Sequence, residues 1–500
     1  MTNLKPNILW YCTDQQRYDT IHALGNKHIR TPNLDSLCKR GTAFDHSYCQ
    51  NPICTPSRAS FMTGRYPAST HVYRNGNEYF PSNERLVTKI LSESGYICGL
   101  VGKLHLAASQ GAVEPRTDDG YSFFEWSHHP YPDIPQGNRY TEWLRDDMNV
   151  DPQELYSTLS GAYGSGVPSE LHQTTWCSNR AIDFINKNKH KPWLLNVNPF
   201  SPHPTFHPPS DYHNRYKPQD MPFPLFEQTD IAHQIRFRTI DQQTLTAVNP
   251  FEVSSSVDNN SSLSRSQSAS IPPQSYDARE VKACYYADIE HIDYQFGRII
   301  QALRETGQLE NTLIIFMSDH GELLGDHGLM YKGCRFYDGL VRVPLIMSYP
   351  GLFKEGLQSS ALVELIDIVP TILEIVGIEV PHFVQGKSLR SLLTGESPPN
   401  IHRNHVICDY FDSLGHETLA FELNPHDKSR GIMYFDGRYK LSLYPEHGIG
   451  ELYDLRNDPG EFHDLWEEKE PTQLQIELTF KLTNAIISTT HAGPLRTKAY

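Results

Sequence analysis

The sequence lacks any run of eighteen or more apolar residues, which is the length that a helix needs to cross a bilayer. Residues 1–7 also lack the charged n-region and the small-residue cleavage site of a signal peptide. We therefore expect no membrane partner, and a cytoplasmic location for the chain as given. A leader removed from ahead of residue 1 would instead make the protein periplasmic or secreted.

Basic residues are scarce relative to acidic ones. The 44 Lys and Arg residues face 59 Asp and Glu residues, which gives a formal net charge of −15. A nucleic-acid-binding surface needs an excess of positive charge, so we expect no nucleic-acid partner. Any anionic substrate must be held by a local pocket of cations.

The cysteines follow no recognisable spacing. Nine are scattered along the chain, without a C-x-x-C pair or a zinc-finger pattern. An odd and irregular set is not typical of a disulfide framework. We expect mostly buried, free thiols.

Short apolar runs alternate with longer helical stretches through most of the chain. A helix is predicted at 278–304, where apolar residues recur at helical spacing. The strand-like runs lie at 7–12, 97–101, 193–197, 312–317 and 344–347. This alternation predicts an α/β fold, with a large, mostly parallel sheet flanked by helices, in a catalytic domain over 1–395.

The pattern changes over 396–500. Strand-like runs at 406–411, 431–435 and 439–444 follow one another, and Asp436-Gly437 is a strong hairpin turn. A helix is predicted at about 472–488. We expect a smaller C-terminal subdomain with an antiparallel sheet and one helix.

Two segments differ in composition from the rest. Residues 254–274 are rich in Ser and Asn and have too little apolar content to fold alone, which predicts a mobile surface insertion. Residues 123–143 are rich in aromatic residues, His and Pro. We interpret them as an ordered loop near a binding site.

The sharpest local pattern is Cys-Thr-Pro-Ser-Arg at 54–58, followed by Thr-Gly-Arg at 63–65. Pro56 suits the first turn of a helix, and Gly64 suits its end. Cys54 would then lie at a helix N-terminus beside Arg58, an environment that favours anions and thiolates. A buried structural Cys before a helix is the alternative reading of these residues.

This pattern resembles the type I, formylglycine-dependent sulfatase family of the alkaline-phosphatase-like superfamily. Further blocks of the family recur in order at 5–8, 31–35, 450–455 and 458–461. The resemblance implies that a separate maturation enzyme oxidises Cys54 to formylglycine. The hydrated gem-diol of formylglycine would then be the nucleophile that cleaves a sulfate monoester.

Acidic residues follow two of the predicted strands. Asp14 follows 7–12 and Asp319 follows 312–317, and strand-end carboxylates brought together can hold a hard cation. The resemblance adds Gln15, His320 and Cys54 to the ligands of one divalent ion, with Ca²⁺ first and Mg²⁺ or Mn²⁺ as alternatives. Many relatives carry Asp and Asn where this chain has Gln15 and His320, which also leaves zinc open.

Cations and imidazoles follow other strands. Strand alternation predicts that Lys103 and His105 share a face after 97–101. The resemblance implies that Lys103 and Lys332 bind the sulfate, with Arg58 adding positive charge. It also implies that His105 acts as a base on formylglycine, and that His203 protonates the leaving oxygen.

The substrate is less defined by the sequence. We expect a sulfated carbohydrate, with small aryl or choline sulfates second. A phosphonate monoester or phosphodiester hydrolase of the same superfamily is the rival activity. A non-catalytic binding protein is disfavoured, because every expected site position is occupied. Further substrate-binding candidates are Trp126, His128, Arg139, His207 and Arg335.

Overall fold

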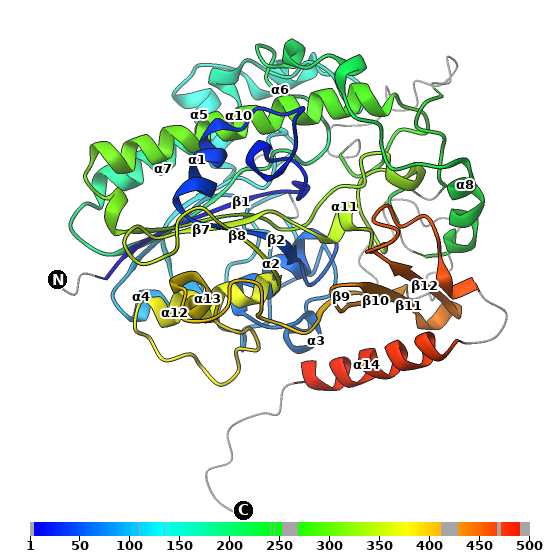
Figure 1. The fold of residues 1–500 in the computed structure, drawn as a ribbon. Coiled ribbons are helices and arrows are strands. Elements are labelled where there is room, and N and C mark those ends of the chain that lie inside the picture. Colours follow the sequence, from blue (N-terminus) through cyan, green and yellow to red (C-terminus); the bar gives the residue numbers. More distant parts are fainter. Residues whose placement is uncertain are drawn as a thin grey trace, which may run out of the picture.

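An eight-stranded sheet forms the centre of the protein (Figure 1). The computed structural model describes residues 5–467 and 472–490, apart from 110, 135, 241, 245, 253–268 and 412–428. In spatial order, the strands are β4 (Tyr121–Trp126), β3 (Ile97–Gly102), β5 (Trp193–Asn198), β1 (Asn7–Thr13), β6 (Thr312–Ser318), β7 (Leu345–Ser348), β2 (Thr42–Tyr48) and β8 (Leu357–Glu364). Only β7 runs antiparallel to its neighbours in this sheet, so the predicted mostly parallel sheet is confirmed.

Both faces of the sheet are buried, which explains why its central strands are apolar throughout. In β1, Ile8, Trp10 and Cys12 belong to the core on one face, while Leu9 and Tyr11 belong to the core on the other. Side chains alternate along a strand, so a strand covered on both faces needs apolar residues at every position.

Helices cover the two faces as separate layers (Figure 1). The first layer includes α10 (Ala278–Glu305), which agrees with the predicted helix, and α7 (Gln173–Lys187), α1 (Pro32–Arg40), α5 (Arg139–Asp146) and α6 (Pro152–Ser157). The second includes α2 (Cys54–Thr63), α4 (Val87–Glu93), α12 (Ile368–Ile375) and α13 (Arg390–Thr394). Shorter helices are α3 (Pro67–Thr70), α8 (Gln228–Gln234) and α11 (Asp338–Val341).

The C-terminal part forms the predicted antiparallel sheet and helix. Its strands are β9 (Val406–Phe411), β10 (Arg430–Phe435), β11 (Tyr439–Tyr444) and β12 (Ile449–Asp454), in the order β12-β11-β10-β9. Helix α14 (Gln473–Thr489) packs Leu478 and Leu482 into a small core with these strands. Tyr66 and Ile366 join that core, so the C-terminal sheet is packed against the first part of the chain.

Several sequence expectations need correction or fall outside the description. Residues 123–143 are not one loop, because they contain most of β4 and the start of α5. The sequence analysis also missed β2, β8 and β12. Residues 254–268 of the expected insertion lie outside the described residues. All nine cysteines are buried and free, as predicted.

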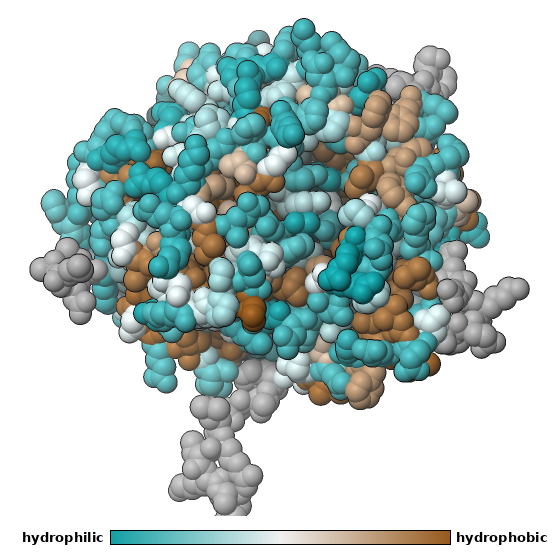
Figure 2. Space-filling view, in the orientation of Figure 1, coloured by the Kyte–Doolittle hydropathy of each residue, from teal (hydrophilic) through white to brown (hydrophobic). Residues whose placement is uncertain are grey.

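Hydrophilic side chains cover most of the face shown in Figure 2, and hydrophobic side chains gather there in smaller groups. Within the described part of the chain, no helix is both long enough and apolar enough to span a bilayer.

Candidate active site at the carboxyl ends of the central strands

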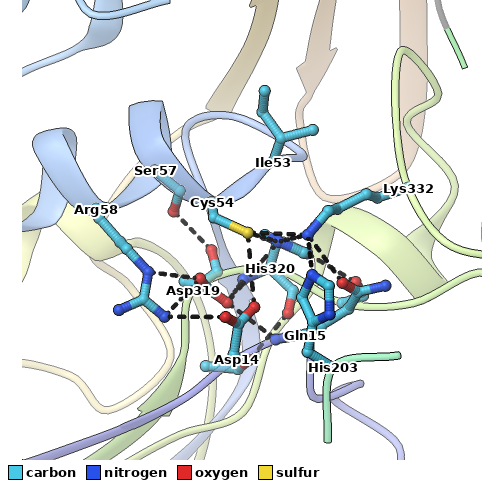
Figure 3. Close-up of polar contacts among 12 residues, drawn as sticks. Asp14, Gln15, Ile53, Cys54, Ser57, Arg58, His203, Asp319, His320 and Lys332 are labelled. Atoms are coloured by element: carbon cyan, nitrogen blue, oxygen red, sulfur yellow. Dashed lines mark hydrogen bonds and ion pairs between the residues drawn. The ribbon is translucent and has the colours of Figure 1, made fainter. Parts of the chain in front are cut away.

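Four neighbouring parallel strands deliver the site residues to one edge of the sheet. Asp14 follows β1, Asp319 follows β6, Lys103 follows β3, and His203 lies in the loop after β5. Parallel strands end at the same edge, where ligands bind in open α/β sheets. Figure 3 shows Cys54, the first residue of α2, beside Asp14, Asp319 and His203.

The Cys54 sulfur is almost completely buried, with 1% of the residue exposed, and is surrounded by polar groups. Lys332 Nζ lies 2.9 Å from Sγ, His320 Nε2 lies 3.1 Å away, and Lys103 Nζ lies 3.7 Å away. Burial and Asp14 would raise the pKa of the Cys54 thiol, but the positive charges of Lys103, Lys332 and His320 outweigh them and lower it. Position 54 is therefore built to hold an anionic or strongly polar group.

The predicted metal ligands meet in space. Asp14, Cys54, Asp319 and His320 each offer a ligand atom, and these atoms all lie within 4.8 Å of one another. His320 Nδ1 donates to the carbonyl of Gly321 at 2.8 Å, so Nε2, which faces Cys54 Sγ, is the nitrogen that would bind an ion. Two buried carboxylates and an oriented imidazole fit a divalent cation.

Gln15 lies beside this group, with its side chain held on both sides. Its Oε1 accepts a hydrogen bond from Lys332 Nζ at 3.0 Å, and its Nε2 donates to the Glu322 carboxylate. Its backbone N–H donates to Asp319 Oδ1 at 3.0 Å. Gln15 therefore links Asp319 to Lys332 through hydrogen bonds of its backbone and its side chain.

Arg58 is the cationic partner of the two carboxylates. Its Nε and Nη2 contact Asp319 Oδ2 at 2.9 and 2.8 Å, and Nη2 lies 3.7 Å from Asp14 Oδ2. Its Nη1 donates to the carbonyl of Lys103 at 3.1 Å. Burial of Asp14 alone would raise its pKa, yet Lys103, His203, Arg58 and Lys332 together hold it well below the usual value.

Lys103 is aimed into the site by the end of β3. Gly102 has φ 96°, and a Cβ there would lie 2.1 Å from the Asn198 carbonyl oxygen, so only glycine fits this turn. The Lys103 ammonium then pairs with Asp14. The alternation argument for Lys103 and His105 does not apply, because β3 ends at Gly102 and both residues lie beyond it.

His203 and Lys332 form a pair on the other side of Cys54. Lys332 Nζ lies 2.9 Å from His203 Nε2, and His203 Nδ1 donates to the Pro204 carbonyl at 2.7 Å. Burial, and then the Lys332 ammonium, lower the pKa of His203 well below its ordinary value. A neutral imidazole accepts at Nε2, so the Lys332 ammonium donates a hydrogen bond to His203.

His105 is held by a residue that the sequence analysis missed. The Glu114 carboxylate accepts hydrogen bonds from the backbone N–H groups of His105, Leu106 and Ala107 at 2.7, 2.7 and 3.1 Å. Trp126 Nε1 donates to the same carboxylate at 2.8 Å. These bonds fix His105 in a left-handed conformation, with φ 56°. Glu114 lies in a loop and follows no motif, so the sequence held no signal for it.

A second missed carboxylate, Glu322, organises the loop that carries Lys332. Glu322 Oε1 accepts from the N–H groups of Leu324 and Tyr331 at 2.9 and 2.6 Å, and Glu322 also binds Gln15. A sequence signal did exist, since Glu322 follows Asp319-His320-Gly321 directly.

Comparison with known proteins identifies the family to which this architecture belongs. The family model described as "Sulfatase" matches residues 6–378, well over half of the chain. The chain belongs to the sulfatase family. A second model, "N-sulphoglucosamine sulphohydrolase, C-terminal", matches residues 325–488. Sulfatases are typically metal-dependent and carry a formylglycine, which agrees with the donor set around Cys54.

The similar proteins include several sulfatases. An arylsulfatase of Clostridium perfringens is 31% identical over 93% of this chain and 91% of its own length. An N-acetylglucosamine-6-O-sulfatase of Bacteroides thetaiotaomicron is 26% identical over 95% of this chain and 85% of its own length. Among solved structures, a phosphonate monoester hydrolase of Agrobacterium radiobacter has a TM-score of 0.80 and 24% identity, covering 99% of this chain and 98% of that chain.

Three of the substrate-binding candidates of this sulfatase do not reach the residues around Cys54. Trp126 is fully buried under Glu114, so it cannot form a wall for a sugar ring. Among the described residues, Arg139 pairs with Glu142 and Glu125. Arg335 is buried against Phe237 and bonds Gln234, so it is not a surface residue.

The other two candidates lie near His105 and His203. The His128 ring packs edge-on against the His105 ring, with 4.4 Å between their centroids. His207 is buried, and its Nδ1 lies 2.7 Å from Thr205 Oγ1. His207 also lines a small cavity together with His203.

Proposed function

We propose that this sulfatase desulfates a carbohydrate, with residue 54 oxidised to formylglycine and with Ca²⁺ bound by Asp14, Asp319, His320 and residue 54. The observation that carries the proposal is the position of Cys54, between two lysine ammonium groups and two carboxylates. A sulfate ester is an anion, so a site for it must supply positive charge close to the attacked sulfur. Lys103 and Lys332 supply that charge from both sides.

Different residues of the site have different roles in the proposed reaction. A formylglycine at position 54 supplies a hydrated aldehyde oxygen as nucleophile, and the bound cation adds Lewis acidity. Lys103 and Lys332 hold the sulfate oxygens and stabilise the charge that spreads over them in the transition state. The proton shared by Lys332 Nζ and His203 Nε2 passes to the departing alcohol oxygen.

His105 is the base in this proposal. Burial, and then Lys103 and His128, hold the pKa of His105 well below its ordinary value, so its imidazole is neutral. A neutral imidazole can accept the proton that must leave residue 54 when free sulfate is released. The Glu114 clamp keeps its backbone in one conformation.

Calcium is favoured by the ligand charges. Asp14 and Asp319 provide two carboxylates, and hard oxygen ligands suit Ca²⁺ and Mg²⁺. His320 adds an imidazole, which also suits Mn²⁺. Metal analysis of the purified protein separates these ions.

Support for a carbohydrate comes from neutral imidazoles beside the sulfate position. Burial lowers the pKa of His128 and of His129, so both can exchange hydrogen bonds with sugar hydroxyls without carrying charge. The relatives named N-acetylglucosamine-6-O-sulfatase and ulvan-active sulfatase point to the same class of substrate. An arylsulfatase and a choline-sulfatase among the relatives keep small sulfate esters as the second choice.

Phosphonate monoester or phosphodiester hydrolysis is the rival activity. Gln15 and His320 stand where many relatives carry Asp and Asn, so this metal site has less negative charge, which is compatible with the rival activity. A similar protein from Trinickia caryophylli is named a multifunctional alkaline phosphatase superfamily protein. Lys103 and Lys332 favour sulfate, because both ammonium groups contact position 54 directly.

Kinetics on matched esters test the proposal. The enzyme should hydrolyse an aryl sulfate with a higher kcat/KM than the corresponding phosphonate monoester and phosphate diester. A panel of defined sulfated oligosaccharides should then show faster desulfation than aryl or choline sulfate. A preference for the phosphorus esters would establish the rival activity instead.

The chemical state of residue 54 provides an independent test. Mass spectrometry of active protein should find the peptide with residue 54 lighter than its thiol form, by the difference between a thiol and an aldehyde. Cys54→Ala and Cys54→Ser should both fold and lose turnover. Full activity in a preparation that contains only unmodified Cys54 would disprove the mechanism.

A further inference from the structure

A second cluster of possible metal ligands lies outside the Cys54 site. His172, Asp288 and His291 each offer a ligand atom, and these atoms lie within 4.8 Å of one another. His172 is the N-cap of α7, while Asp288 and His291 lie one turn apart on α10. All three residues are buried, with 8%, 4% and 0% of their surface exposed.

Two polar atoms in this cluster have no hydrogen-bond partner among the residues that the structure describes. Asp288 Oδ1 and His291 Nδ1 are buried without a hydrogen bond. His291 Nε2 is already engaged by Thr175 and Gln295, at 3.1 and 3.2 Å. Leaving a buried polar atom unpaired is costly, so such atoms normally have a ligand, an ion or a water.

His172 has one ring nitrogen that is hydrogen-bonded and one that is available to a ligand. Its Nδ1 accepts a hydrogen bond from the Thr174 backbone N–H at 3.3 Å, which leaves Nε2 as the nitrogen available to a ligand. The His172 and His291 rings are perpendicular, with 5.0 Å between their centroids. Two separate observations, the close spacing of three ligand-bearing side chains and the two buried atoms without a described partner, therefore concern the same three residues.

The charge of the cluster is also incomplete. Among the described residues, no Lys or Arg side chain forms an ion pair with Asp288, which lines a small cavity together with Ser201. A buried carboxylate without a cation is costly, and a bound positive ion would remove that cost.

We propose that this cluster binds a divalent transition-metal ion of the zinc type through Nε2 of His172, a carboxylate oxygen of Asp288 and Nδ1 of His291. Two imidazoles and one carboxylate form a set that suits Zn²⁺ and Co²⁺ better than Ca²⁺. A cavity of about 30 Å³, lined by His172, Asp288 and His203, adjoins the cluster. It has room for a water in the fourth coordination position.

The ion would join parts of the fold that carry the active site. It ties the start of α7 to α10, and Asp288 lines one cavity with Ser201, which lies two residues before His203. The Ser201 carbonyl in turn accepts from the Asp14 backbone N–H at 3.4 Å. The role of this second ion is to hold the loop after β5 in place, and the proposal does not depend on the substrate of the enzyme.

Metal content of the whole protein tests the proposal. Wild-type protein, His291→Gln and His172→Gln are each depleted with a chelator, loaded with Co²⁺, freed of excess ion and analysed for cobalt per chain. Wild type should hold one more ion than either variant. The absorption spectrum of wild type should contain a low-coordinate Co²⁺ component that is missing from the spectra of both variants. His190→Gln, at an exposed histidine, is the matched control and should equal wild type.

Comparison between variants keeps the result separate from the Cys54 site, because the Asp14 and Asp319 ligands are intact in all four proteins. His172→Gln, at the end of a helix, provides the test if His291→Gln does not fold. Equal cobalt content in wild type and a folded His172→Gln or His291→Gln protein would show a hydrated polar pocket without a metal, and would overturn the proposal.

Discussion

Nζ of Lys332 lies 2.9 Å from Sγ of Cys54, although 278 residues separate them in the sequence. The same ammonium lies 2.9 Å from Nε2 of His203 (Figure 3). Lys332 therefore links the position of the nucleophile to the position of the leaving-group acid. A single side chain can stabilise the sulfate charge and share the proton that the alcohol takes.

The first prediction concerns the two lysines at Cys54. Lys332→Met and Lys103→Met each remove a cation from a site for an anionic ester, so each should lower kcat/KM for an aryl sulfate by about 10²–10³-fold. Lys282→Met removes another buried lysine, on α10, and should retain most of the activity. A similar loss in all three variants would mean that general destabilisation, and not charge at Cys54, explains the effect.

The second prediction concerns the cation. Chelation should abolish activity, and Ca²⁺ should restore it. Asp319→Asn removes a ligand charge while keeping an oxygen near Arg58, so it should fold but bind the ion weakly and lose activity. Activity that survives exhaustive chelation, with no divalent ion detected by elemental analysis, would contradict the proposed metal site.

The third prediction concerns Glu114, which acts through His105. Glu114→Gln replaces one acceptor oxygen by an amide N–H₂ group that faces backbone donors, so the loop at His105 should shift. We expect kcat to fall by part of the roughly 10²–10⁴-fold that a general base contributes, with KM little changed. The pH profile of kcat should change as well.

A purely structural role for Glu114 would give a different result. Glu84→Gln, at another buried glutamate, is the control, and it should lower stability without changing kcat. If Glu114→Gln lowers only the melting temperature, as Glu84→Gln should, Glu114 does not position His105.

The fourth prediction concerns a buried ion-pair network between the two sheets. Lys440 on β11 contacts Asp338 on α11, and its Nζ lies 2.8 Å from Glu461 Oε1. Lys440→Met leaves the buried Glu461 without its cation and leaves Asp338 paired with Arg342 alone, so it should lower the free energy of unfolding by about 3–5 kcal/mol at neutral pH. Denaturant unfolding measures this loss, and a change below about 1 kcal/mol, the usual size for an exposed ion pair, would count against a buried network.

The network also makes stability depend on pH in a defined direction. Burial would raise the pKa of Asp338, but Lys440 lowers it to about 2, from 3.8. The contribution of Asp338 to stability should therefore be complete above about pH 4 and be lost as the pH falls towards 2. Burial raises the pKa of Glu461 from 4.5 to about 7, so its contribution should be lost as the pH rises through that interval. In Lys440→Met, the loss of stability that Asp338 causes between about pH 4 and pH 2 should disappear.

The sequence alone determined the fold class and most of the site. Continuous apolar runs predict strands buried on both faces, and the alternation with helices predicts a parallel sheet, so the strand ends that carry Asp14, Asp319 and Lys103 are expected at one edge. Local chemistry also fixed the helix that begins at Cys54 and ends before Gly64. These features depend on residues that are neighbours in the chain.

Only the tertiary structure showed which side chains are buried and which distant residues they contact. Trp126 reads as a binding-site aromatic in the sequence, yet the fold places it in the core, because its burial depends on β3 and on Glu114. Glu114 and the His172–Asp288–His291 group belong to no motif, and the position of Glu322 directly after Asp319-His320-Gly321 does not reveal its partners. Their roles depend on backbone groups and side chains that meet only after distant segments pack together. The hydrogen-bond partners of a buried carboxylate, and not its neighbours in the sequence, determine what it does.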